Sequence, residues 1–207
     1  MTASATSPHI GLVVEGPGDR NALPVLLRKH LHGEGEYRDV LGKPVATNGR
    51  DKALKVNGIE GFALAAALRP GCVGVLVVLD GEGDCVADLG PSLLERVGNA
   101  VGKPVRIALA DCDFESWLFA SAETLDLELV FSEDIVGQGA IKEALKPAKY
   151  VKPTWQPRLT HRMEIGRAAQ RSDSLRRMLA RFDELRPFLP PLAQSGSPEL
   201  TRPGEDQ

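Results

Sequence analysis

Acidic residues stand at the ends of three apolar segments of this chain. Each segment is short enough to be a β-strand, and the acids follow it at once. They are Glu15 after the first segment, Asp80, Glu82 and Asp84 after the second, and Asp111, Asp113 and Glu115 after the third. Converging carboxylates repel one another unless a cation neutralises them, and such oxygen ligands suit Mg²⁺ or Mn²⁺. If the three segments are neighbours, the acids predict a site for a divalent ion that also binds substrate phosphates.

The acidic turn after the second segment has an alternative interpretation as an EF-hand. Asp80, Glu82 and Asp84 match the first three ligand positions of that calcium loop. Cys85 and Pro91 stand where the loop needs a glycine and a bidentate glutamate, so the motif is excluded. A plain acidic turn without a ligand stays open as the structural interpretation.

The glycine-rich turn after the first segment does not make a nucleotide-binding P-loop. Residues 16–19 read Gly-Pro-Gly-Asp and lack the Gly-Lys-Ser/Thr ending that cradles phosphates. Taken alone, Glu15 is a polar residue at a strand end before a glycine turn. The case for chemistry therefore depends on the acids meeting in the fold.

The segments that must bring the acids together alternate between strand and helix patterns. Strands are predicted over 9–14, 73–79 and 105–110, with a weaker one within 37–47. Helices are predicted from Asp19 to Gly33, over 59–68 and around 92–100, and a loop over 48–57. This alternation predicts an α/β fold with a parallel sheet flanked by helices, in which ligands bind beyond the carboxyl ends of the strands. Asp113 is placed to cap a helix that carries Glu115.

The pattern changes after residue 125. A short helix is predicted over 137–146, a loop over 147–157 and mostly helix over 162–188, where Leu175, Met178 and Phe182 form an apolar stripe. We therefore divide the chain into an α/β core, 1–125, a C-terminal helical extension packed on it, 126–190, and a disordered tail, 191–207.

The net charge of −3 conceals an uneven distribution. Residues 142–186, which we call the basic arm, hold 12 Lys and Arg against 5 Asp and Glu. Such an arm can bind phosphates, but charged runs often only keep a face solvated. The candidate phosphate-binding residues are Arg162, Arg176, Arg177 and Arg181 in the arm, and Arg50 and Lys52 outside it.

Composition limits the class of protein. Hydrophobic residues make up 43% and charged residues 26%, as in soluble globular chains. The longest apolar run, 72–79, is too short to span a membrane, and no secretory signal is visible. Cys72, Cys85 and Cys112 form no CxxC pair, which argues against a zinc ribbon and a disulfide framework. We expect a cytoplasmic protein without a membrane partner.

Two motifs together resemble the Toprim domain, the metal-binding fold of topoisomerases, bacterial primases and OLD-family nucleases. Residues 13–19, VVEGPGD, look like its first motif, a strand-end glutamate followed by glycine, with a second acid at Asp19 as in OLD-like members. Residues 79–84, LDGEGD, look like its DxD motif, with Glu82 replacing the middle aspartate. Residues 110–119 are similar to a segment of small stand-alone Toprim-like proteins that often accompany an ATPase, and an acid there corresponds to Glu115.

The resemblance implies a Toprim-like (Rossmann-like) core and a nuclease activity that hydrolyses phosphodiester bonds in DNA or RNA. It implies Mg²⁺ or Mn²⁺ as the cofactor and an ATPase as a partner in a defence or repair system. Glu15 and Asp80 would be catalytic, with Glu15 as general acid or base. The metal would be held by Glu15, Asp19, Asp80, Glu82, Asp84 and Glu115. The alternative is a non-catalytic Toprim scaffold that binds nucleic acid or a partner protein.

Overall fold

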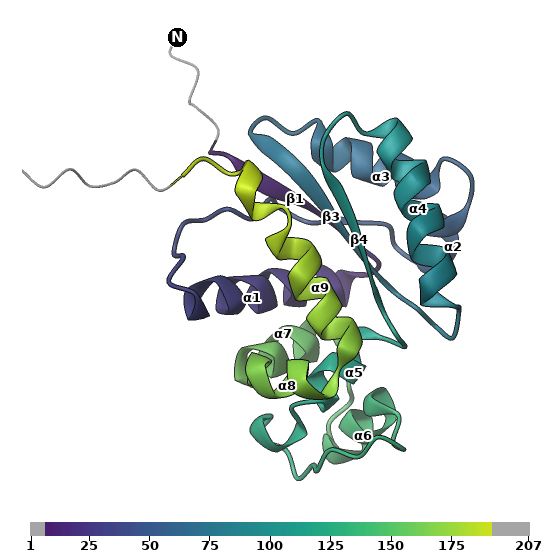
Figure 1. Cartoon of the computed structure of the whole chain (residues 1–207). Helices are drawn as coiled ribbons and strands as arrows, with labels where there is room; N and C mark the ends of the chain where they lie inside the picture. Colours follow the sequence, from purple (N-terminus) through teal and green to yellow (C-terminus); the bar gives the residue numbers. More distant parts are fainter. Residues whose placement is uncertain (1–6, 192–207) are drawn as a thin grey trace, which may run out of the picture.

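A parallel β-sheet is the centre of the protein, and helices cover both of its faces (Figure 1). The computed structural model describes residues 7–191. The strands are β1 (His9–Val14), β2 (Val45–Ala46), β3 (Cys72–Asp80) and β4 (Val105–Ala110), in the order β2-β1-β3-β4. All neighbouring strands are parallel. The predicted α/β class is therefore confirmed, and so is the adjacency of the three strands that carry the acids.

The helices follow the strands in alternation and then run on without further strands. They are α1 (Pro17–Gly33), α2 (Arg50–Leu54), α3 (Gly58–Ala67), α4 (Val86–Ala100), α5 (Phe114–Phe119), α6 (Gly137–Ala144), α7 (Lys152–Arg162), α8 (Ile165–Arg171) and α9 (Asp173–Asp183). Two short 3-10 turns, η1 (Ala122–Thr124) and η2 (Arg186–Phe188), complete the order. No helix in the described range is long and apolar enough to cross a membrane.

Alternation along the strands builds a separate core on each face of the sheet. Leu76 and Val78 of β3 face α1 and α9, whereas Val75, Val77 and Leu79 face α3 and α4. Successive side chains of a strand point to opposite faces, so a strand covered on both sides must be apolar throughout. This is why β3 is the most continuous apolar segment of the chain.

Three predicted boundaries in the helices and loops were wrong. The loop expected over 48–57 contains the short helix α2, and α4 begins at Val86 rather than near residue 92. The loop expected over 147–157 contains the start of α7, where Pro153 lies in the first turn, a position that needs no N–H donor. Pro157 also lies inside α7, and the carbonyl of Pro153, which Pro157 cannot pair, accepts a hydrogen bond from Asn21 Nδ2 at 3.3 Å.

The expected helix over 162–188 is divided into α8 and α9. Ser172 separates them, because its side chain accepts a hydrogen bond from the N–H of Leu175 and caps α9. The weak strand within 37–47 is reduced to the two residues of β2 and an isolated bridge between Leu41 and Ile10.

The helical extension packs directly on the α/β core. Helix α7 lies along α1, and Leu159, Met178 and Phe182 share one buried cluster with β1. The indole Nε1 of Trp117 in α5 donates to Ser174 Oγ in α9 at 3.0 Å, which joins the two parts by a buried hydrogen bond. The predicted disordered tail, 191–207, lies outside the described residues except for its first residue.

Candidate active site at the carboxyl end of the sheet

The carboxyl ends of β1 and β3 bring two of the predicted acids into contact. Glu15 follows β1 and Asp80 ends β3, and the backbone N–H of Asp80 donates to Glu15 Oε2 at 3.3 Å. Asp80 is buried, and its Oδ1 accepts from the N–H of Phe114, the first residue of α5, at 3.1 Å. Gly81 keeps the following turn close to β4, because a Cβ at that position would lie 2.4 Å from the carbonyl oxygen of Ala110.

Two helix N-termini add a third and a fourth acid. Asp19 lies in the first turn of α1, where its Oδ2 accepts from the N–H of Gly16 at 2.9 Å. Glu115 lies in the first turn of α5 and is completely buried. Asp113 caps α5 as predicted, by accepting from the N–H of Ser116. We call Glu15, Asp19, Asp80 and Glu115 the acidic rim.

Helix α7 supplies the donors that connect the acidic rim. The amide Nε2 of Gln156 lies 3.2 Å from Asp19 Oδ1 and 3.2 Å from Glu115 Oε1, so it bridges the two carboxylates. Gly18 makes room for it, because a Cβ on Gly18 would lie 1.8 Å from Gln156 Oε1. The hydroxyl of Tyr150, just before α7, donates to Glu115 Oε1 at 2.7 Å.

Lys152 is the ammonium group at the acidic rim. Its Nζ lies 3.3 Å from Glu115 Oε2 and 4.0 Å from Asp80 Oδ2. Burial lowers the pKa of Lys152, but the charges of Glu115, Asp80 and Asp19 raise it by more, so the group stays protonated. Lys152 therefore acts on three of the four rim carboxyl groups, and the charge of Arg50 acts on the fourth, Glu15.

Three carboxyl groups of the rim have raised pKa values. Burial, reinforced by the charges of Asp19 and Glu15, raises the pKa of Asp80 to about 8. Burial also raises the pKa of Glu15 and of Asp19, although each accepts a backbone hydrogen bond that opposes the shift. Neighbouring carboxyl groups whose pKa values are shifted in this way are characteristic of functional sites.

Glu82 and Asp84, the other two predicted metal ligands, lie on the exposed turn beyond β3. Both carboxylates pair with Arg50, at 3.8 Å in the case of Glu82, and Arg50 also donates to the backbone oxygen of Asp80. The structure therefore places them beside the rim but engaged with a cation. Arg50, a candidate for binding nucleic acid, holds this acidic turn against the end of β3.

The residues of the rim fit a divalent ion in their chemistry. All four are carboxyl groups. Two buried oxygens, Gln156 Oε1 and Glu115 Oε2, accept no hydrogen bond from any described residue, although Glu115 Oε2 forms an ion pair with Lys152. No three of the rim carboxylates bring their ligand atoms within 4.8 Å of one another, and Lys152 and Gln156 contact them instead. A hard cation would satisfy these acceptor oxygens and neutralise the carboxylates.

A second group of potential ligands lies elsewhere, between α1 and α9. Within residues 7–191, His30, Glu34 and Asp183 form the one set whose three ligand atoms lie within 4.8 Å of one another, and they can supply ligands to a metal ion. Arg186 contacts both carboxylates, at 3.0 Å from Asp183 Oδ1, and offsets one of their two negative charges.

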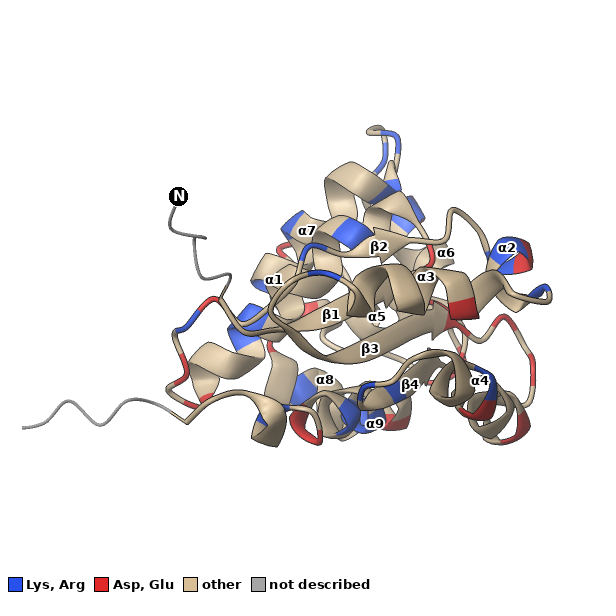
Figure 2. Cartoon of the chain, turned by 90° about the horizontal axis from the view of Figure 1, so that it is seen from above, with Lys and Arg blue, Asp and Glu red and all other residues tan. Residues whose placement is uncertain are grey.

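The arginines of the basic arm have acidic partners along the surface. Figure 2 shows Lys and Arg along α7 and α9 and Asp and Glu on the turn after β3. The pairs are Arg162 with Asp126, Arg176 with Asp173, Arg177 with Asp111 and Arg181 with Glu184. Lys52 is exposed on α2 and makes no ion pair with a described residue. The positive charge of the arm is thus largely compensated in place.

The sequence reasoning missed Lys152, Gln156 and Tyr150 as members of the site. The only signal was the Lys- and aromatic-rich composition of 147–157, and two prolines hid the start of α7 within it. None of the family models, curated proteins or solved structures compared with the chain matches it, so its function has to be inferred from the geometry of the acidic rim.

Proposed function

We propose that this protein is a Mg²⁺- or Mn²⁺-dependent nuclease whose active site is the acidic rim. The observation that carries the proposal is the hydrogen bond from the backbone N–H of Asp80 to Glu15 beside two further buried carboxyl groups. Two cations, Lys152 and Arg50, offset these four groups only in part. Burial, with the charges of Asp19 and Glu15, raises the pKa of Asp80 to about 8, so ionising this carboxyl is costly unless a cation binds beside it. The sequence resemblance to Toprim domains points to the same chemistry.

The residues that would hold the metal are Asp80, Asp19 and Glu115, with Glu15 at their edge, and their carboxylates would have to draw closer together to share one ion. A bound divalent ion would polarise a phosphoryl oxygen and stabilise the leaving oxyanion. Gln156 and Tyr150 hold the carboxylate of Glu115 in place by hydrogen bonds to Oε1, and Oε2 pairs with Lys152. This support by outer donors is the usual way in which a ligand set is oriented.

Glu15 and Lys152 have separate roles in the proposed reaction. Glu15 is less buried than Asp80 and has a raised pKa, so it is suited to exchange a proton with water or with a leaving group. Lys152 keeps its charge among the carboxylates and would stabilise the negative charge that develops on the phosphate.

The phosphate backbone of the substrate requires cations that are not already paired. Arg20, Lys52 and Lys149 are exposed and make no ion pair with any described residue. Arg20 follows Asp19 and Lys149 precedes Tyr150, so both lie beside the acidic rim along the chain. We therefore assign the first phosphate contacts to these three residues.

The substrate class in this proposal is DNA or RNA, and the resemblance adds an ATPase partner. A second candidate, a non-catalytic scaffold, is favoured by one observation. Lys152 already contributes a positive charge to Asp80 and Glu115 at 4.0 and 3.3 Å, as a substitute for a metal would. The two candidates differ in whether the rim binds a divalent ion.

The experiment that separates them combines metal binding with cleavage. Plasmid DNA, single-stranded DNA and RNA are each incubated with the purified protein, with and without Mn²⁺, and Mn²⁺ binding is measured by calorimetry. Asp134→Asn, on an exposed turn, is the matched control for Asp80→Asn. Cleavage and Mn²⁺ binding that Asp80→Asn loses and Asp134→Asn keeps would support the nuclease. Absence of both in the wild-type protein would favour the scaffold.

A further inference from the structure

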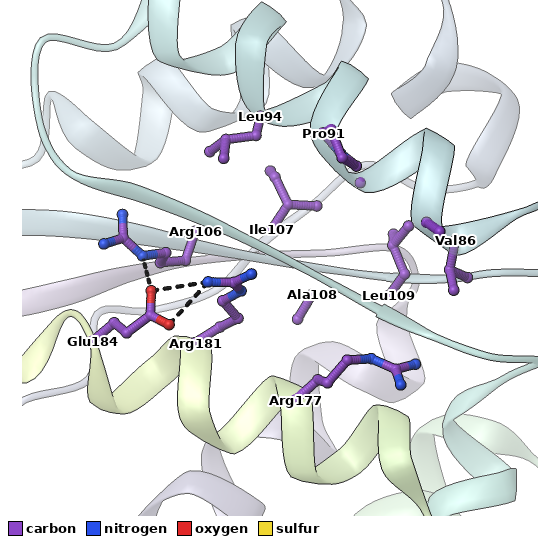
Figure 3. Close-up of a pocket in the computed structure, with 12 residues that line it drawn as sticks. Val86, Pro91, Leu94, Arg106, Ile107, Ala108, Leu109, Arg177, Arg181 and Glu184 are labelled. Carbon is purple, nitrogen blue, oxygen red and sulfur yellow. Dashed lines mark hydrogen bonds and ion pairs between the residues drawn. The ribbon is translucent and has the colours of Figure 1, made fainter.

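The edge of the sheet formed by β4 lies at the base of a groove. Strand β4 pairs with β3 on one side and with no described residue on the other. The groove has a volume of about 540 Å³ and runs between α4 and α9 (Figure 3). Ile107 and Ala108, whose side chains point to opposite faces of the sheet, both line it. The groove therefore opens onto the free edge of the strand.

The pairing of β4 identifies which of its backbone groups face the groove. The N–H of Val75 donates to the carbonyl of Pro104, and the two backbone groups of each residue in a parallel strand face alternate sides along the chain. The residues that face outward are therefore Val105, Ile107 and Leu109. The carbonyl of Val105 accepts a hydrogen bond from its neighbour Arg106, as expected for an outward group.

The backbone groups of Ile107 and Leu109 remain open. Neither their N–H nor their outward C=O groups have a hydrogen-bond partner among the described residues, although both residues are almost completely buried. An edge that presents unpaired N–H and C=O groups is a template for another strand.

The two walls of the groove differ in chemistry. Val86, Pro91 and Leu94 form the wall on α4, and Figure 3 shows them above the strand. The opposite wall, on α9, carries Arg177 and Arg181, which are each about half exposed. One wall is therefore apolar and the other is basic.

The basic wall keeps a net positive charge after its own ion pairs are counted. Arg106 and Arg181 share the single carboxylate of Glu184, and Arg177 pairs with Asp111. Three guanidinium groups thus face two carboxylates. An occupant with acidic side chains toward α9 complements this charge.

We propose that the groove binds an extended, acidic peptide segment of a partner protein as a fifth strand of the sheet. Its backbone pairs with Ile107 and Leu109, which supplies the missing hydrogen bonds. Because side chains alternate along a strand, every second residue is apolar and faces α4, and the residues between them are acidic and face Arg177 and Arg181. The proposal does not require the acidic rim to be catalytic.

A second copy of the chain is a poorer occupant. Antiparallel pairing of β4 with β4 about a two-fold axis would set α9 beside α9, which brings Arg177 and Arg181 of one copy towards those of the other. Like charges placed opposite one another at an interface are unfavourable. We therefore expect the protein to be monomeric at this edge.

The test uses two short synthetic peptides, one of alternating Val and Glu and one of alternating Val and Lys, and measures binding by calorimetry. We expect the Val/Glu peptide to bind more tightly than the Val/Lys peptide. N-methylation is then introduced at every second residue, in either of the two registers. One register should lose at least about tenfold in affinity, because it removes the N–H groups that face β4, and the other should lose little. Equal effects of the two registers would overturn pairing as a strand.

Variants on α9 test the charge of the groove. Arg177→Glu with Arg181→Glu should reverse the preference and favour the Val/Lys peptide. Arg176→Glu, on the same helix but paired with Asp173 outside the groove, is the control and should keep the wild-type preference. Circular dichroism checks that each variant is folded. An unchanged preference in the folded double variant, or a dimer of the wild-type protein that the Val/Glu peptide dissociates, would refute the proposal.

Discussion

The ammonium of Lys152 lies 3.3 Å from Oε2 of Glu115, a carboxylate that is completely buried. Lys152 is the first residue of α7 and Glu115 lies in the first turn of α5, so the ion pair joins two helix N-termini at the end of the sheet. A buried charge is tolerated only when it is paired or hydrogen-bonded. The contact therefore fixes where the helical extension meets the α/β core.

Asp80→Asn should make the protein more stable at high pH. The pKa of Asp80 is about 8 in the folded protein and near 3.8 when unfolded, so between these values the folded state holds a proton that the unfolded state has lost. Wild-type stability should therefore fall as pH rises from about 4 to about 8. The variant should lack this contribution and be more stable at pH 8.5 by about 2 kcal/mol. Urea unfolding of both proteins at pH 5 and 8.5 measures this difference in stability. A variant that is less stable than the wild-type protein at pH 8.5 would contradict the prediction.

Divalent ions should stabilise the protein, and more at pH 8 than at pH 6. Mn²⁺ competes with the proton on Asp80, which is present at pH 6 and half lost at pH 8. At a free concentration one hundred times its Kd, Mn²⁺ should add about 2.7 kcal/mol to the free energy of unfolding. Thermal unfolding with increasing Mn²⁺ at both pH values is the measurement. A larger effect at pH 6, or an equal one in Asp80→Asn, would place the ion elsewhere.

Glu15→Gln should separate metal binding from catalysis. The amide keeps an oxygen that can accept the hydrogen bond from the N–H of Asp80, but it cannot exchange a proton. We expect Mn²⁺ affinity to change little and the cleavage rate to fall by about a hundredfold or more. Calorimetry and a single-turnover cleavage assay test the two parts, and full activity in Glu15→Gln would end the assignment of proton transfer to this residue.

Gly18→Ala should destabilise the protein because it displaces Gln156. The new Cβ would lie 1.8 Å from Gln156 Oε1 and 2.8 Å from the Cβ of Lys152, so the start of α7 must move. The expected loss is about 1–3 kcal/mol. Gly139→Ala, in α6 with nothing near its Cβ, is the control and should be neutral or stabilising by up to about 1 kcal/mol. Equal unfolding midpoints for the two variants would show that the close approach at Gly18 does not contribute to the stability of the protein.

Unpaired lysines, rather than the paired arginines of α9, should dominate nucleic-acid binding. Lys52→Glu with Lys149→Glu should weaken binding and reduce the log–log salt slope on duplex DNA by about 1.8. Arg176→Glu with Arg177→Glu should change the slope less, because these side chains are already paired with Asp173 and Asp111. Fluorescence anisotropy at several salt concentrations gives the slopes. A larger change in the arginine variant would return the substrate surface to α9.

The positions of the strands and of the acids that follow them could be predicted from the residues alone. Apolar runs at 9–14, 73–79 and 105–110 have strand periodicity, and parallel strands place the residues that follow them at one edge. Asp80 and Glu15 were therefore identified as neighbours from their positions alone. The cap at Asp113 was also predicted, because a short acidic side chain just before a helix accepts a hydrogen bond from a free N–H of the first turn.

The groups that surround those acids could not be predicted in the same way, because they come from distant parts of the chain. Lys152 and Gln156 reach Glu115 and Asp19 because α7 packs along α1, and that packing is set by contacts between segments far apart in the sequence. Local rules also misplaced the start of α7, since two prolines indicate a loop when their neighbours are not known. The charge of the basic arm likewise depends on which acid each arginine meets. Pairing across the fold is a property of three-dimensional distance, and residue spacing along the chain does not encode it directly.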